Sequence, residues 1–153
     1  MIRLVVAAVL TLATLSAALP AVDDARAGRT DAELEGAIDR IERAGQHLAV
    51  SEDAVPRRAR AAGRRVAIRL PEASLTAARP AFVAVGGRPD GPGNRSVVAY
   101  ASGGSPTRLR RLSLPVPLAT PDGPVVFTAA GRHAVDIALV DDAGRPTLVV
   151  TRG

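Results

Sequence analysis

The sequence contains no cysteine, no lysine and no tryptophan, and all twenty of its basic residues are arginine. A chain without cysteine has no disulfide, no thiolate metal site and no thiol nucleophile. Without lysine it has no P-loop lysine, no Schiff base and no lysine general base. These two absences exclude several classes of enzyme before any motif is considered.

Aromatic residues make up only 2% of the 153 residues, although hydrophobic residues make up 47%. The large rings are Phe82, Tyr100 and Phe127. The core must therefore consist mainly of Val, Leu, Ile and Ala, which bury less apolar area per residue than aromatic side chains. We expect one small β-rich domain of modest stability.

Catalytic and metal-binding motifs are equally scarce. His47 and His133 are the two histidines, and neither has the spacing of a metal-ligating pair. The sequence lacks a G-x-S-x-G elbow and a G-x-G-x-x-G loop. We expect no enzymatic activity, no metal and no cofactor. The remote alternative is a small hydrolase with a site assembled around His133 and Asp136.

Charge is distributed unevenly along the chain. Residues 22–53 contain nine acids and four arginines, whereas residues 54–153 contain fifteen arginines and six acids. This polarity predicts two physically different parts, an acidic one followed by a basic one.

Residues 1–22 form the first segment, a membrane anchor or signal segment. Leu4 to Val22 is uncharged over 19 residues, close to the roughly 20 that a membrane-spanning helix needs. Arg3 precedes the apolar run and Asp23-Asp24 follow it, which predicts a cytoplasmic N-terminus and an extracytoplasmic remainder. The segment is either an uncleaved anchor, the interpretation we favour, or a signal peptide cleaved near Ala27 after Ala25-Arg26-Ala27.

Residues 23–50 predict an acidic amphipathic helix. Thr30-Asp31-Ala32-Glu33 has the form of a capping box, so we expect the helix to begin near Thr30 and a bend at Gly28 if it continues from the apolar segment. Four apolar residues lie on one stripe at helical spacing. They are Leu34, Ile38, Ile41 and Leu48. The stripe packs either on the β domain of the same chain or on a protein partner.

Residues 51–63 are expected to be an Arg-rich linker. The basic residues that could contact an anion begin here and continue into the next segment. They are Arg57, Arg58, Arg60, Arg64 and Arg65. A basic cluster can bind anionic lipid or an acidic protein face. Nucleic acid is not expected as a partner, because the predicted location is extracytoplasmic and no aromatic residues alternate with the arginines.

Residues 64–153 predict an antiparallel β domain. Short alternating apolar runs are separated by Gly- and Pro-rich turns, the last being a hairpin of 134–140 and 147–151 with a loop of four to six residues. Pro115 and Pro117 indicate that the run 112–118 is an edge strand or irregular. The expected fold class is α+β, with an N-terminal apolar helix and polar helical extension before a small antiparallel sheet or sandwich.

Asn94-Arg95-Ser96 is an N-x-S acceptor triplet in a Gly/Pro-rich loop. Asn94 is therefore a candidate for glycosylation, provided that the domain is exported.

The order of an apolar N-terminal helix, a polar helical extension and a small β domain resembles type IV pilins and pseudopilins. The lysine-free composition, rich in Arg, Ala, Val and Asp, is similar to that of small membrane-anchored or exported haloarchaeal proteins. This resemblance implies a non-enzymatic, pilin-like or accessory component of a cell-surface or secretion assembly. The alternative is a tethered module that binds an anionic glycan or an acidic partner.

Overall fold

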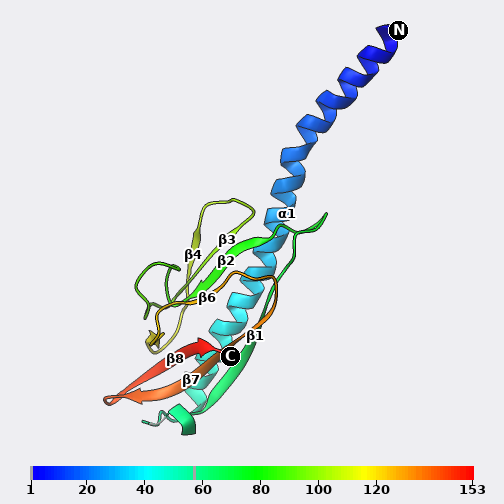
Figure 1. The fold of residues 1–153 in the computed structure, drawn as a ribbon. Coiled ribbons are helices and arrows are strands. Elements are labelled where there is room, and N and C mark those ends of the chain that lie inside the picture. Colours follow the sequence, from blue (N-terminus) through cyan, green and yellow to red (C-terminus); the bar gives the residue numbers. More distant parts are fainter. Residues whose placement is uncertain (1, 57) are drawn as a thin grey trace.

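The computed structural model describes residues 2–56 and 58–153, which form one long α-helix, one short 3-10 helix and eight β-strands (Figure 1). The fold class expected from the sequence is confirmed: a long N-terminal helix is followed by two small, mostly antiparallel sheets. Figure 1 shows the first half of the helix projecting away from the sheets, and the second half lying along them.

Helix α1 (Ile2–Ser51) is a single unbroken helix of 50 residues, about 75 Å long at 1.5 Å per residue. Pro20 and Gly28 both lie inside it, so the expected helix start near Thr30 is wrong. The alanine- and leucine-rich sequence on both sides favours helix strongly enough to continue through these two residues. Segments 1–22 and 23–50 of the sequence prediction are therefore two parts of one rod.

The first sheet has the strand order β1-β7-β8-β5. Its strands are β1 (Gly63–Leu70), β7 (Gly131–Asp142), β8 (Arg145–Arg152) and β5 (Leu118–Ala119). The expectation of a purely antiparallel domain needs one correction, because the two-residue strand β5 pairs with β8 in parallel. The short 3-10 helix η1 (Arg58–Arg60) precedes β1 in the segment expected to be a linker.

The second sheet has the strand order β4-β3-β2-β6, and its pairs are antiparallel. Its strands are β4 (Arg108–Arg111), β3 (Val97–Ser102), β2 (Pro80–Val85) and β6 (Val125–Phe127). Residues 112–117, expected as an edge strand or irregular, are irregular. Pro115 and Pro117 lack the N–H that a ladder needs, and this segment carries the chain from the second sheet to the first.

The hairpin between β7 and β8 is tighter than expected. Asp142 pairs with Arg145, so the loop contains only Ala143 and Gly144. Both have positive φ, 51° and 82°, which the type I′ turn of a two-residue hairpin requires.

The core lies between the second half of α1 and the inner faces of the two sheets. Alternate residues of β1, namely Val66, Ile68 and Leu70, point toward the helix and are buried. Tyr100 and Phe127 add the only two rings of this otherwise aliphatic core. One cooperative core therefore includes the helix and both sheets.

Candidate functional site

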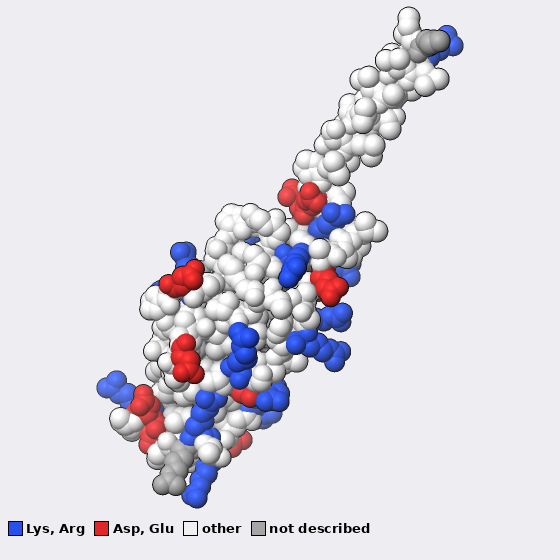
Figure 2. Space-filling model, viewed as in Figure 1, with Lys and Arg blue, Asp and Glu red and all other residues white. Residues whose placement is uncertain are grey.

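The projecting half of α1 is the most distinctive surface of the molecule. Every described residue from Ile2 to Ala25 is exposed, and Figure 2 shows this half as an almost uncharged rod with basic atoms at its tip and acidic atoms at its base. Leu4, Leu12 and Leu19 are 79%, 65% and 62% exposed. By length and composition the helix can cross a membrane, or it can serve as a signal sequence.

The polar side chains within this apolar half are satisfied by the helix itself. The hydroxyls of Thr11, Thr14 and Ser16 donate to carbonyls four residues earlier, at 2.8, 2.9 and 2.8 Å. Such bonds hide hydroxyls that would otherwise be costly to place in hydrocarbon. The three residues are thus compatible with a membrane-spanning segment.

The loop between β1 and β2 forms hydrogen bonds with α1 at the point where the helix leaves the domain. The hydroxyl of Thr30, which is fully buried, donates to the carbonyl of Ala78 and accepts from the N–H of Ala78, at 2.9 and 3.0 Å. One turn earlier, Arg26 Nε donates to the carbonyl of Leu75 at 2.8 Å. The residues expected as a signal-peptidase site, Ala25-Arg26-Ala27, are thus helical and lie against the domain.

The apolar stripe of the acidic segment lies inside the protein's own core. Leu34, Ile38, Ile41 and Leu48 are each no more than 2% exposed and contact the sheets of the same chain. Packing on the β domain is therefore the correct alternative of the two. The stripe is not available to a protein partner, and any contact surface has to be sought elsewhere.

The acidic face of the helix is matched by arginines of β4. Arg108 pairs with the buried Asp31 at 2.7 Å, and Arg110 pairs with Asp39 at 2.5 Å. The carboxylate of Asp39 raises the pKa of Arg110 above its usual value, chiefly through this hydrogen bond. The opposite charges of the two chain segments therefore meet across the helix–sheet boundary.

Next to this pairing, the hydroxyl of Tyr100 donates to the carboxylate of Glu35 at 3.2 Å. Burial is the main cause of the raised pKa of this phenol, and the nearby Glu35 adds to it. Tyr100 is therefore a neutral hydrogen-bond donor that links the core to the acidic face of α1.

The predicted anion-contact arginines do not form one cluster. Arg65 pairs with Asp136 across the β1–β7 ladder, with both contacts at 2.8 Å, and Arg58 donates to the hydroxyl of Thr151. Arg64 contacts His47 Nδ1 at 3.2 Å. Arg60 is exposed on η1, and Arg57 lies outside the described residues. Arg65 and Arg58 both lower the pKa of Asp136, Arg65 mostly by hydrogen bonding.

Asn94 has a structural function that the sequence motif did not indicate. Its backbone is left-handed, with φ of 61°, and its N–H donates to Thr120 Oγ1 at 3.0 Å. In return, its side-chain oxygen accepts from the N–H of Thr120 at 2.7 Å. The side chain is exposed, so glycosylation of its amide nitrogen stays a prediction.

The remote hydrolase pair is not brought together. His133 and Asp136 are three residues apart on β7, so they point to opposite faces of the sheet. His133 Nε2 contacts the carbonyl of Ala129 at 2.6 Å, whereas Asp136 bonds Arg65. Within residues 2–56 and 58–153, no three His, Asp or Glu side chains are grouped as metal ligands would be.

A family model described as a domain of unknown function, DUF7311, matches residues 1–153. The chain belongs to the DUF7311 family. The match includes the apolar helix as well as the β domain. No curated protein and no solved structure matches the chain.

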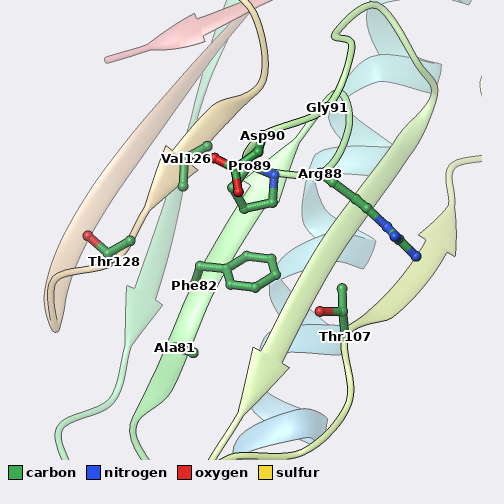
Figure 3. Close-up of a pocket in the computed structure, with 9 residues that line it drawn as sticks. All are labelled: Ala81, Phe82, Arg88, Pro89, Asp90, Gly91, Thr107, Val126 and Thr128. Carbon is green, nitrogen blue, oxygen red and sulfur yellow. The ribbon is translucent and has the colours of Figure 1, made fainter.

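Two surface features of this DUF7311 chain were missed by sequence reasoning. The first is Leu75, which is 84% exposed at the tip of the β1–β2 loop. The second is an open groove of about 540 Å³ on the outer face of the second sheet. Figure 3 shows the ring of Phe82 in the groove, with Pro89 and Asp90 on one side and Thr107 on the other. Neither could be found from sequence, because an isolated Leu or Phe gives no periodic signal.

Proposed function

We propose that this DUF7311 chain is a non-enzymatic cell-surface protein tethered to the membrane by an uncleaved N-terminal helix. The observation that carries the proposal is the division of α1. Its first half exposes apolar side chains along its whole length, whereas its second half is built into the core. Because one continuous helix forms both parts, the β domain would be held rigidly at a fixed distance from the membrane.

The charges at the two ends of the apolar segment support an extracytoplasmic β domain. Arg3 precedes the segment and Asp23-Asp24 follow it. Basic residues are retained on the cytoplasmic side of membrane helices. This charge distribution supports an orientation in which residues 23–153 lie outside the cytoplasm.

The contacts of Arg26 and Thr30 support the uncleaved state. Cleavage after Ala27 would remove Arg26 and its bond to Leu75, and would leave Thr30 as the third residue of a new, frayed terminus. A helix whose residues on both sides of Ala27 are joined to the same loop is better suited to remain intact.

As the more specific role, we propose a pilin-like or accessory component of a surface or secretion assembly. The support is the layout of one projecting helix fixed to a compact β domain. Because the stripe from Leu34 to Leu48 is buried, the exposed apolar surface of the projecting half of α1 is where we expect subunits to contact one another.

Membrane fractionation with N-terminal sequencing tests the anchor. We expect the full chain, with its original N-terminus, to resist extraction from membranes by alkaline carbonate. Leu12→Arg places a charge at the middle of the apolar segment, which costs about 2.5–3.5 kcal/mol of insertion free energy, and should release the protein. Val50→Arg, at an exposed apolar residue on the other end of α1, is the matched control. A soluble full-length wild type would contradict the proposal.

The absence of cysteine allows a clean test of topology and assembly. Single cysteines at Leu10 and Leu15, on the projecting half, should crosslink between copies in membranes if subunits associate there. A cysteine at Val50 should react with a membrane-impermeant maleimide added outside the cell. Recovery of monomers alone would exclude the assembly role and leave the anchor standing.

One observation favours a second candidate, a tethered module that binds an anionic glycan or acidic partner. Arg58 and Arg60 lie on η1, which Figure 1 shows at the end of the molecule remote from the N-terminus, and Arg60 is exposed. Retention of the detergent-solubilised chain on a heparin column, lost in the Arg60→Gln variant, would support it. Flow-through of the wild type at moderate salt would exclude it.

A further inference from the structure

The β1–β2 loop carries an apolar side chain at a particular height along α1. A single exposed leucine is ordinary on a protein surface. Leu75 differs because it lies beside the helix at Ala18, Ala21 and Val22, where the apolar segment ends. The loop and the helix line an open, mostly apolar notch of about 500 Å³.

The loop is held in this position by several hydrogen bonds. Ser74 Oγ accepts from the N–H groups of Thr76 and Ala77 at 3.2 and 3.1 Å, which shapes the tip. Arg26 holds the carbonyl of Leu75, and Thr30 holds Ala78. Leu75 is thus presented by an anchored loop and is not a side chain on a free loop.

The height of Leu75 agrees with the thickness of a bilayer. Leu4 to Val22 spans about 28 Å of helix at 1.5 Å per residue, and the hydrocarbon core is about 30 Å thick. When this segment fills the core, Val22 lies at the outer boundary and Asp23 lies among the headgroups. Leu75, in the notch beside Val22, then meets the same boundary.

The arginines beside the notch are also suited to the headgroup region of a bilayer. Arg26 and Arg29 line the notch. Arg26 is bound to the carbonyl of Leu75 and to Asp23, whereas Arg29 is 63% exposed and can extend to a lipid phosphate while its stem stays in apolar surroundings. The rings of Phe82, Tyr100 and Phe127 belong to strands of the second sheet and do not line the notch. Leu75 is the exposed apolar side chain that the loop presents beside the notch.

We propose that the tip of the β1–β2 loop is a second membrane contact, in which Leu75 inserts into the outer lipid leaflet beside α1. The inference rests on the proposed anchor and deepens it. One helix alone leaves the domain free to rotate about the helix axis. A second contact displaced from that axis fixes which face of the β domain is turned toward the membrane.

Single-cysteine variants of the full chain test this in vesicles of phosphatidylcholine and phosphatidylglycerol, with an environment-sensitive fluorophore and nitroxide-labelled lipids as quenchers. Leu12→Cys reports the anchor, Leu75→Cys the loop, and Val50→Cys is the control. Val50 is 79% exposed and Leu75 is 84% exposed, so they differ mainly in their position along the molecule.

We expect blue-shifted emission at positions 12 and 75. A quencher deep in the bilayer should act on position 12, one near the headgroups on position 75, and neither on position 50. Quenching at position 12 without quenching at position 75 would overturn the inference while leaving the anchor intact. In a further sample, a second copy that carries a nitroxide at position 75 is added. Quenching by this copy and not by the labelled lipids would assign the notch to a protein contact, and would also overturn the inference. No quenching at position 12 would defeat the proposed anchor itself.

Discussion

The hydroxyl of Thr30 forms two hydrogen bonds with one residue, Ala78, which is 48 positions away in the sequence. It donates to the carbonyl and accepts from the N–H, so a single side chain forms a hydrogen bond with each of the two backbone polar groups of a residue in the β1–β2 loop. The pairing joins the helix to the loop at the level where α1 leaves the β domain.

Thr30→Val tests the contribution of this pairing, because valine keeps the shape of threonine and removes its hydroxyl. The carbonyl of Ala78 loses its hydrogen bond to Thr30, and its N–H keeps only a long bond of 3.5 Å to the carbonyl of Arg26. Loss of such a hydrogen bond at a partly buried position costs about 1–3 kcal/mol. We expect the free energy of unfolding of the detergent-solubilised chain to fall by that amount, measured by circular dichroism during denaturation.

Thr107→Val is the matched control, since Thr107 is exposed. It should leave stability within about 0.5 kcal/mol of wild type, as exposed substitutions usually do. Equal stability of both variants would show that the Thr30 bonds are replaced by water without loss.

Gly45 lies where α1 packs tightly against Leu114 and Leu148 of the β domain. A Cβ on this residue would lie 2.8 Å from Leu114 Cδ2 and 3.1 Å from Leu148 Cδ1. Gly45→Val should therefore destabilise the chain by about 1–3 kcal/mol through overpacking. Gly36→Val is the control on the same helix, because a Cβ there meets only the end of Arg40 at 3.9 Å. Equal effects in thermal melts would contradict close packing at Gly45.

Asn94 and Thr120 exchange two hydrogen bonds while Asn94 has a left-handed backbone. Asn94→Ala loses the side-chain bond and places alanine at positive φ, a strain of about 1–2 kcal/mol. Asn94→Gly loses the same bond without that strain. We expect both variants to be less stable than wild type, with the glycine variant the milder by about 1 kcal/mol. The reverse order would mean that backbone strain is not important here.

The sequence was sufficient to predict the parts of the fold that depend on periodicity. The spacing of Leu34, Ile38 and Ile41 placed them on one face, and they are buried. The alternation of Val66, Ile68 and Leu70 predicted β1, which the structure contains. In both cases the apolar residues of a repeated local pattern are the ones that face the core.

The parts that the sequence did not predict depend on distant contacts. The capping signal at Thr30 is not used, because the helix continues upstream and the hydroxyl bonds Ala78 instead. Strand β4 has no apolar alternation, and Arg108 and Arg110 of this strand pair with acids of α1. Leu75 gave no signal at all, since its environment is set by Arg26, 49 residues earlier.

Asp136 gives the chain a measurable response to acid. Its hydrogen bonds to Arg65 lower its pKa below the usual 3.8. A carboxyl whose pKa is lower in the folded state stabilises that state above its unfolded pKa, and this stabilisation is lost as pH falls through the folded pKa. We therefore expect the melting temperature to decline below pH 3.8, and the decline to be shallower in Asp136→Asn. Asp122→Asn, at an exposed loop carboxyl, is the control and should keep the wild-type profile. A wild-type profile in Asp136→Asn would show that the ion pair with Arg65 is fully screened by solvent.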